Sequence, residues 1–152
     1  MTEVFTNDWS QVMDFALKVG IATISGLLIG LEREFKGKEA GLKTNTLVAI
    51  GAAVFVLISM RFYGEEYTDI TRVLSQIVTG IGFLGAGVIL QNEKEERVKG
   101  LTTAATLWCS AGAGCLAAMA MWLELAILTV LVVIVNIAFG YIDDRLSKNS
   151  TQ

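Results

Sequence analysis

Two carboxylates flank an arginine in the triplet Glu32-Arg33-Glu34, which follows the first long apolar run of the chain. Carboxylate oxygens are ligands that Mg²⁺ prefers, and hydrated Mg²⁺ needs only one or two of them because it keeps several waters. Glu32 and Glu34 are therefore candidate Mg²⁺ ligands, with Arg33 beside them. The alternative is a charged cluster that ends a helix at the membrane edge, where charged side chains are commonly placed.

Polar and basic residues also open two later apolar runs, and six of them are candidates for a binding role: Lys43, Thr44, Asn45, Lys99, Thr102 and Thr103. Thr and Asn are frequent N-caps, because their side chains accept hydrogen bonds from the free N–H groups at a helix start. Two helix starts beside lysines also favour an anion, such as a phosphate or a partner's carboxylate. Capping and anion binding both remain open.

Asn136 is an isolated polar residue in the last apolar run. A polar side chain inside a membrane is costly and normally finds a partner. We expect a hydrogen bond within the helix bundle or across a dimer interface. A single amide cannot form an ion path, so a structural bond is the favoured interpretation.

No catalytic residue is predicted. The chain has no histidine, which removes the commonest general base and metal ligand. The segment Gly80–Gly85 matches the GxGxxG pattern of dinucleotide sites, but that pattern needs a preceding strand and an acid about 20 residues later. The residues before Gly80 have a helical pattern, and Ala105 stands where the acid is required. We predict no enzyme activity and no cofactor, Mg²⁺ excepted.

The composition is that of an integral membrane protein. Hydrophobic residues make up 53% of the chain, charged residues 18%, and the mean hydropathy is +0.58. These values favour a chain that is embedded in a lipid bilayer over one with a soluble core. The net charge of −3 argues against a nucleic-acid partner, which would require a basic patch.

The uncharged runs predict one all-α transmembrane domain that covers residues 1–152, with five helices at about 14–31, 44–60, 73–91, 102–120 and 122–142. Each run is long enough to cross the bilayer at 1.5 Å per residue. Nine cations then fall on one side of the membrane: Arg33, Lys36, Lys38, Lys43, Lys94, Arg97, Lys99, Arg145 and Lys148. Because cytoplasmic loops are rich in Lys and Arg, we predict the N-terminus outside and the C-terminus inside.

Two of these helices contain sets of small residues, and those of the first repeat every four residues. The first set is Ala22, Gly26 and Gly30, and the second is Gly80, Gly82, Gly85 and Gly87. In membranes, small residues let helix backbones approach closely enough to pack. We expect both sets to make helix contacts, with a homodimer or small homo-oligomer, and a contact with another inner-membrane protein, as the possible assemblies.

Three segments together resemble one known family: GLKTNTLVAIGAAVF, QIVTGIGFLGAGVIL and VKGLTTAATLWCSAGAG. In this order and spacing they are similar to the MgtC/SapB family of bacterial inner-membrane proteins, over about residues 27–118. The resemblance implies a multi-pass protein of the inner membrane that is linked to adaptation to magnesium limitation and, in some members, to virulence. Many members carry a soluble ACT-like domain after the membrane part, and the sequence ends at Gln152, so we expect the membrane part alone.

The resemblance leaves two functions open. One is a non-enzymatic regulator that acts through membrane helix contacts, and the small-residue faces favour it. The other is a Mg²⁺ transporter or channel, which Glu32 and Glu34 would serve. No ionisable residue falls near the middle of a predicted helix, whereas proton-coupled carriers normally place acids there. The regulator is therefore the leading hypothesis.

Overall fold

The computed structural model describes residues 8–62, 69–90 and 99–149. Within these ranges the chain is all-helical, with α1 (Trp9–Phe35), α2 (Leu42–Arg61), α3 (Ile70–Leu90), α4 (Leu101–Ala118) and α5 (Trp122–Asn149). All five helices are long and apolar enough to cross a membrane. The predicted all-α, five-helix membrane architecture is confirmed, while the N-out, C-in orientation stays a prediction.

The first and last helices extend beyond the predicted membrane spans. The first was predicted over residues 14–31, but α1 begins at Trp9, where the Asp8 side chain accepts a hydrogen bond from the N–H of Ser10 at 3.3 Å. It continues through the charged residues to Phe35, and Gly37 follows in a left-handed conformation (φ 60°). These limits were wrong because charged residues end a membrane span without ending a helix, whereas capping and turn residues do end it.

A glycine directly precedes each of α2 and α4. Gly41 and Gly100 occupy the N-cap positions, and neither helix has a side-chain cap at that residue. One free N–H at the start of α2, that of Leu42, donates instead to Oε2 of Glu34 at 2.9 Å. Of the two roles left open for Thr44, Asn45, Thr102 and Thr103, N-capping is therefore wrong, because both helices start earlier and these residues lie inside the first turns.

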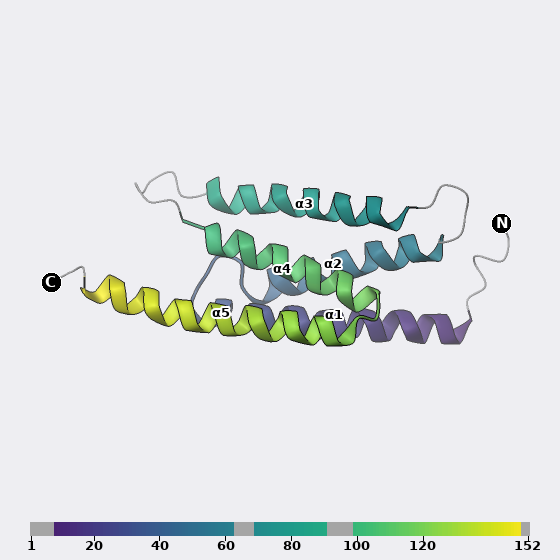
Figure 1. Cartoon of the computed structure of the whole chain (residues 1–152), viewed down its shortest axis with the longest axis horizontal. Coiled ribbons are helices and arrows are strands. Elements are labelled where there is room, and N and C mark those ends of the chain that lie inside the picture. The colour runs from purple at the N-terminus through teal and green to yellow at the C-terminus, as the bar shows by residue number, and fades with distance from the viewer. Residues whose placement is uncertain (1–7, 63–68, 91–98, 150–152) are drawn as a thin grey trace.

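The helices lie roughly side by side along the long axis of the molecule (Figure 1). The most extensive interfaces join α1 to α2 and α2 to α4, while α5 packs against α1 and α4. The main core contains small and branched apolar side chains from these four helices, including Ala22, Ile29, Val56, Ala113 and Leu125. By contrast, α3 lies along one edge of the bundle and contacts mainly α4.

Two of the predicted small residues of α1 lie directly against the backbone of α2. A Cβ atom added to Gly26 would stand 2.7 Å from the Cα of Thr46, and one added to Gly30 would stand 2.7 Å from the Cα of Leu42. Ala22, on the same face, is fully buried. This face of α1 is therefore covered by the chain itself and is closed to another protein.

The glycines of α3 differ from those of α1. A Cβ added to Gly80, Gly82 or Gly87 would meet nothing within 4 Å, and only Gly85 packs, at 3.3 Å from the Cβ of Ala104. At three of the four glycines that were expected to make contacts, no other described helix therefore approaches within 4 Å of the Cβ position.

Candidate functional site

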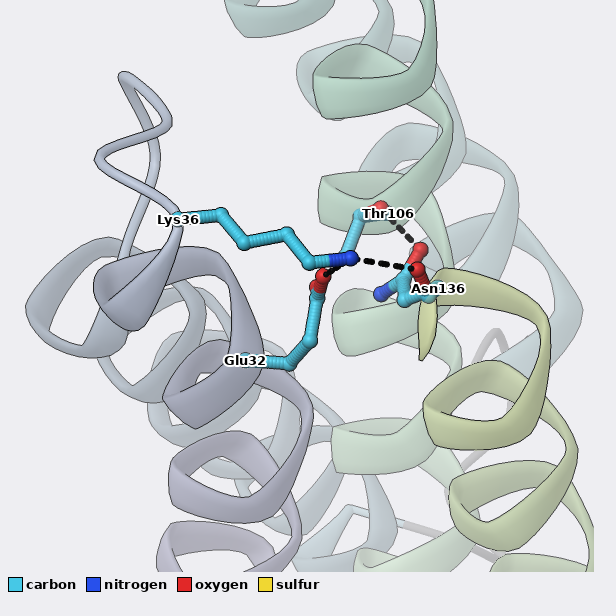
Figure 2. A network of polar contacts seen from close by, with 4 residues as sticks. All are labelled: Glu32, Lys36, Thr106 and Asn136. Atoms are coloured by element: carbon cyan, nitrogen blue, oxygen red, sulfur yellow. Dashed lines mark hydrogen bonds and ion pairs between the residues drawn. The ribbon is translucent and has the colours of Figure 1, made fainter. Parts of the chain in front are cut away.

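Several of the predicted residues meet at one end of the bundle, where α1 ends and α4 begins. Lys36 forms an ion pair with Glu32, one turn earlier on α1, at 2.8 Å. The Lys36 ammonium also lies 3.5 Å from the backbone carbonyl of Asn136 on α5. Figure 2 shows how these groups from α1 and α5 meet beside Thr106 of α4, whose hydroxyl lies 3.4 Å from Oδ1 of Asn136.

Asn136 thus has contacts within the bundle, which was one of the two expected alternatives; the other was a contact across a dimer interface. The Thr106 hydroxyl donates to the carbonyl of Thr102 at the shorter distance of 2.8 Å. The 3.4 Å contact satisfies at most one end of the Asn136 amide, whichever way the amide is turned. Its Nδ2 is buried without a hydrogen-bond partner.

Arg33 is buried between α1 and α4, with only 4% of its surface exposed. One guanidinium nitrogen, Nη2, donates to the hydroxyl of Thr103. Its Nε has no hydrogen-bond partner, and no carboxylate pairs with Arg33 in the described part of the chain. A buried cation without a counter-charge is costly, because the low dielectric of the interior replaces the water that would solvate it.

Glu32 and Glu34 are engaged separately. The Glu32 side chain is nine-tenths buried, and its Oε1 contacts Lys36, while its Oε2 has no hydrogen-bond partner in the described ranges. Glu34 points to the start of α2 and accepts the N–H of Leu42. No group of three or more His, Cys, Asp or Glu residues suited to a metal ion occurs among the described residues. Mg²⁺ binding by Glu32 and Glu34 stays a prediction.

A cavity of about 250 Å³ opens among these side chains. Its polar lining residues are Glu32, Arg33, Lys36, Lys38, Thr102 and Asn136, and its apolar wall comes from Val135, Phe139 and Gly140 of α5. Three cations therefore face one carboxylate, so the cavity favours an anion over a cation. We name it the polar cavity.

The remaining predicted residues lie elsewhere. Asn45 is fully buried between α2 and α4, where its Nδ2 donates to the carbonyls of Ala40 and Gly41 and its Oδ1 accepts the hydroxyl of Ser110 at 2.7 Å. It is a structural cross-link between the two helices. Lys99 is exposed just before α4.

Lys43 and Thr44 line a second feature, a groove of about 850 Å³ between α2 and α3. The walls are mostly apolar and include Leu47, Val48, Gly51, Ala52 and Phe55 of α2, with Val73, Gln76, Ile77, Gly80, Ile81 and Leu84 of α3. Because α2 and α3 run in opposite directions, Lys43 near the start of α2 and Arg72 near the start of α3 lie at opposite ends of the groove. We name it the α2–α3 groove.

Sequence reasoning missed Lys36 and Lys38 as site residues, and it missed a buried hydrogen bond between the hydroxyls of Ser25 and Thr129 at 2.6 Å. The spacing of Glu32 and Lys36 by four residues would have indicated an ion pair on one helical face. That indication was lost because the predicted first helix ended at Leu31. The Ser25–Thr129 contact joins residues that are 104 positions apart in the sequence, and no local sequence pattern predicts it.

Comparison with known proteins gives a consistent result. The model of the MgtC family matches residues 19–145. The protein MgtC of Brucella abortus is 47% identical over 128 residues, which cover 84% of this chain and 52% of that protein. An uncharacterized Synechocystis protein is 44% identical over 131 residues, or 86% of this chain and 53% of its own length.

The protein MgtC of Salmonella typhimurium is 42% identical over 134 residues, which cover 88% of this chain and 56% of that protein. The chain thus spans about half the length of these relatives. No solved structure matches it.

Proposed function

This chain belongs to the MgtC family, and on that premise we propose that it is a non-enzymatic regulator of the bacterial inner membrane in adaptation to magnesium limitation. It acts by binding a transmembrane helix of another inner-membrane protein. Virulence, which the family resemblance links to some members, would be a consequence of this adaptation in hosts that restrict magnesium.

The α2–α3 groove is the observation that carries this proposal. Gly51 on α2 and Gly80 on α3 both line it, and a Cβ added to either would meet nothing within 4 Å. Small residues at an open face let a second helix approach closely, and in lipid that approach is favoured by packing rather than by the hydrophobic effect. Both walls are thus suited to an incoming helix.

The dimensions of the groove also suit a membrane helix. Its α2 wall runs from Lys43 to Phe55, which is about 18 Å at 1.5 Å per residue. That is more than half of a hydrocarbon core of about 30 Å. Lys43 and Arg72 at its two ends suit acidic or headgroup-facing residues that flank a partner helix.

A matched pair of leucine substitutions tests the groove. Gly80→Leu fills it, whereas Gly82→Leu adds the same side chain at an equally open glycine of α3 that does not line it. In a host that lacks its own MgtC-family protein, Gly80→Leu should abolish growth at low Mg²⁺ and Gly82→Leu should preserve it, at equal amounts in the membrane. Normal growth with Gly80→Leu would contradict the proposal. Cross-linking identifies the occupant, and a homodimer would show a second copy of the chain in the groove.

Magnesium transport is the alternative, and the described site gives it little support. The carboxylate of Glu32 is already paired with Lys36, and two further cations line the same cavity. Purified full-length chain in proteoliposomes should therefore show no Mg²⁺ flux above protein-free vesicles. Flux that disappears in Glu32→Gln would replace the regulator with a transporter.

A further inference from the structure

The polar cavity has an excess of positive charge that nothing in the described chain balances. Lys36 is neutralised by Glu32, but Arg33 and Lys38, which line the same cavity, form no ion pair with a described residue. Only 4% of the Arg33 surface is exposed. A guanidinium is buried to this extent at low cost only when an anion or several acceptors reach it.

Unused hydrogen-bonding groups mark the same place. Among the residues that the structure describes, Arg33 Nε and Asn136 Nδ2 are buried donors without acceptors, and Glu32 Oε2 is a buried acceptor without a donor. All three residues line the polar cavity. Buried polar groups are nearly always paired, so several unpaired ones around one cavity indicate a missing ligand. That ligand must offer anionic oxygens to Arg33 and Asn136, and a hydroxyl or ammonium to Glu32.

An apolar groove continues from the polar cavity. It has a volume of about 500 Å³, lies between α1 and α5, and shares Glu32 and Lys36 with the cavity. Its other lining residues are almost entirely apolar: Leu28, Leu31, Phe35, Thr129, Val130, Val133, Ile134 and Ile137. In a membrane, an apolar groove on the side of a bundle is open to lipid chains. A ligand that fills both spaces has a polar anionic head and an apolar tail.

We propose that this combined site binds one phospholipid. Its phosphate contacts Arg33, Lys36 and Lys38, and an acyl chain lies in the groove between α1 and α5. A headgroup with hydroxyls or an ammonium also supplies the donor that Glu32 Oε2 lacks. The lipid belongs to the leaflet that the distribution of cations predicts to be cytoplasmic, and anionic headgroups are attracted to such basic sites between helices.

Gly140→Leu is the most direct variant to test the site. A Cβ added to Gly140 would stand 1.9 Å from Nζ of Lys36, which is the free end of a flexible side chain, so the leucine fills the cavity without meeting backbone. Gly82→Leu on α3, where a Cβ meets nothing within 4 Å, is the matched control. Lys38→Gln removes one exposed cation from the cavity rim and replaces it with a neutral side chain of the same number of heavy atoms.

The measurement is native mass spectrometry of the purified full chain in detergent, titrated with phosphatidylglycerol or phosphatidylethanolamine, and separately with inorganic phosphate. We expect one retained phospholipid per chain. Its apparent affinity should fall on the order of tenfold in Gly140→Leu, a factor that corresponds to about 1.4 kcal/mol. Lys38→Gln should show a smaller loss, and Gly82→Leu none.

Two results would overturn the proposal. Equal phospholipid retention by folded Gly140→Leu and the unmodified chain would place the retained lipid elsewhere on the surface. Saturable binding of inorganic phosphate that Gly140→Leu abolishes, without retention of any phospholipid, would show that the cavity takes a free anion and that the groove holds no tail.

Discussion

Two sets of glycines in this bundle differ in what surrounds them: one set packs against the backbone of a neighbouring helix, and the other faces open space. Where α1 and α4 meet α2, a Cβ added to Gly26 or Gly114 would stand 2.7 Å or 2.1 Å from backbone atoms of α2. On α3, a Cβ added to Gly80, Gly82 or Gly87 would meet nothing within 4 Å. The burial of α4 and α3 agrees with this difference. Half of the membrane-spanning part of α4 is buried, whereas only 6% of the membrane-spanning part of α3 is buried.

The comparison separates two uses of the same residue. In the central interfaces glycine lets backbones of one chain come together, so the fold requires it. On α3, Gly80 leaves part of one helix face without a side chain, and a Cβ added there would meet nothing within 4 Å in the described part of the chain. Each such residue also lowers intrinsic helix propensity. A face of this kind suits a second membrane helix, which is why the proposed regulator function rests on α3 and not on α1.

The largest expected effect contrasts the two sets directly. Gly114→Leu forces a side chain into the backbone of Ala49 and against the Cβ of Ala52 on α2, and overpacking a core typically costs about 1–3 kcal/mol or more. Gly87→Leu on α3 meets open space and should leave stability nearly unchanged. Thermal unfolding in detergent, followed by circular dichroism, measures both. Equal stability of the two variants would remove the distinction between the regions.

A second effect concerns buried polar contacts. Asn45→Ala removes two hydrogen bonds to the carbonyls of Ala40 and Gly41 and leaves the Ser110 hydroxyl without its 2.7 Å acceptor on α2. Losing such buried bonds costs about 1–3 kcal/mol. Gln76→Ala, on the exposed face of α3, is the control and should change the free energy of unfolding by less than about 0.5 kcal/mol. A comparable loss from Gln76→Ala would show that α3 is held more firmly than its burial indicates.

A smaller effect is expected at the α1–α5 contact. Thr129→Val removes the 2.6 Å hydrogen bond to Ser25 and keeps the shape of the side chain, so the cost should be about 0.6 kcal/mol, an average value for such bonds in membranes. Thr79→Val on α3 should be close to neutral, because the Thr79 hydroxyl donates to the carbonyl of Ser75 in its own helix and to no other described residue. Unfolding by titration with sodium dodecyl sulfate resolves the two. A larger loss at Thr79 would contradict the ranking.

The smallest effect is local to the start of α3. The hydrogen bond from the Thr71 hydroxyl lowers the pKa of Asp69 below its ordinary value of 3.8. A lowered pKa stabilises the folded form at pH values above the ordinary one, and this contribution disappears as the pH falls through the lowered pKa. The first turn of α3 should therefore fray at low pH in the unmodified chain, and Asp69→Asn should abolish that dependence. Amide hydrogen exchange at Thr71 measures it, and an unchanged pH profile in Asp69→Asn would refute the assignment.

Sequence reasoning found the elements of this fold because each depends on local features. Uncharged runs of the right length predict five helices, and all five are present. The limits of α1 were wrong by several residues, since the sequence shows where the bilayer ends and the helix continues past that point through Glu32 and Arg33. Asn136 was expected to find a hydrogen-bond partner, and Arg33 was named only as a member of the charged cluster, so the burial of Arg33 against Thr103 was not anticipated.

By itself, the sequence determined the fold class, the membrane setting and the family, because hydrophobic run length and motif order are properties of neighbouring residues. Only the tertiary structure decided which face of each helix meets another helix. It paired Arg33 with Thr103, 70 residues away, turned Gly26 inward, and left Gly80 open. The physical reason is that rotation of a helix about its axis is set by packing against distant helices, which no local pattern encodes.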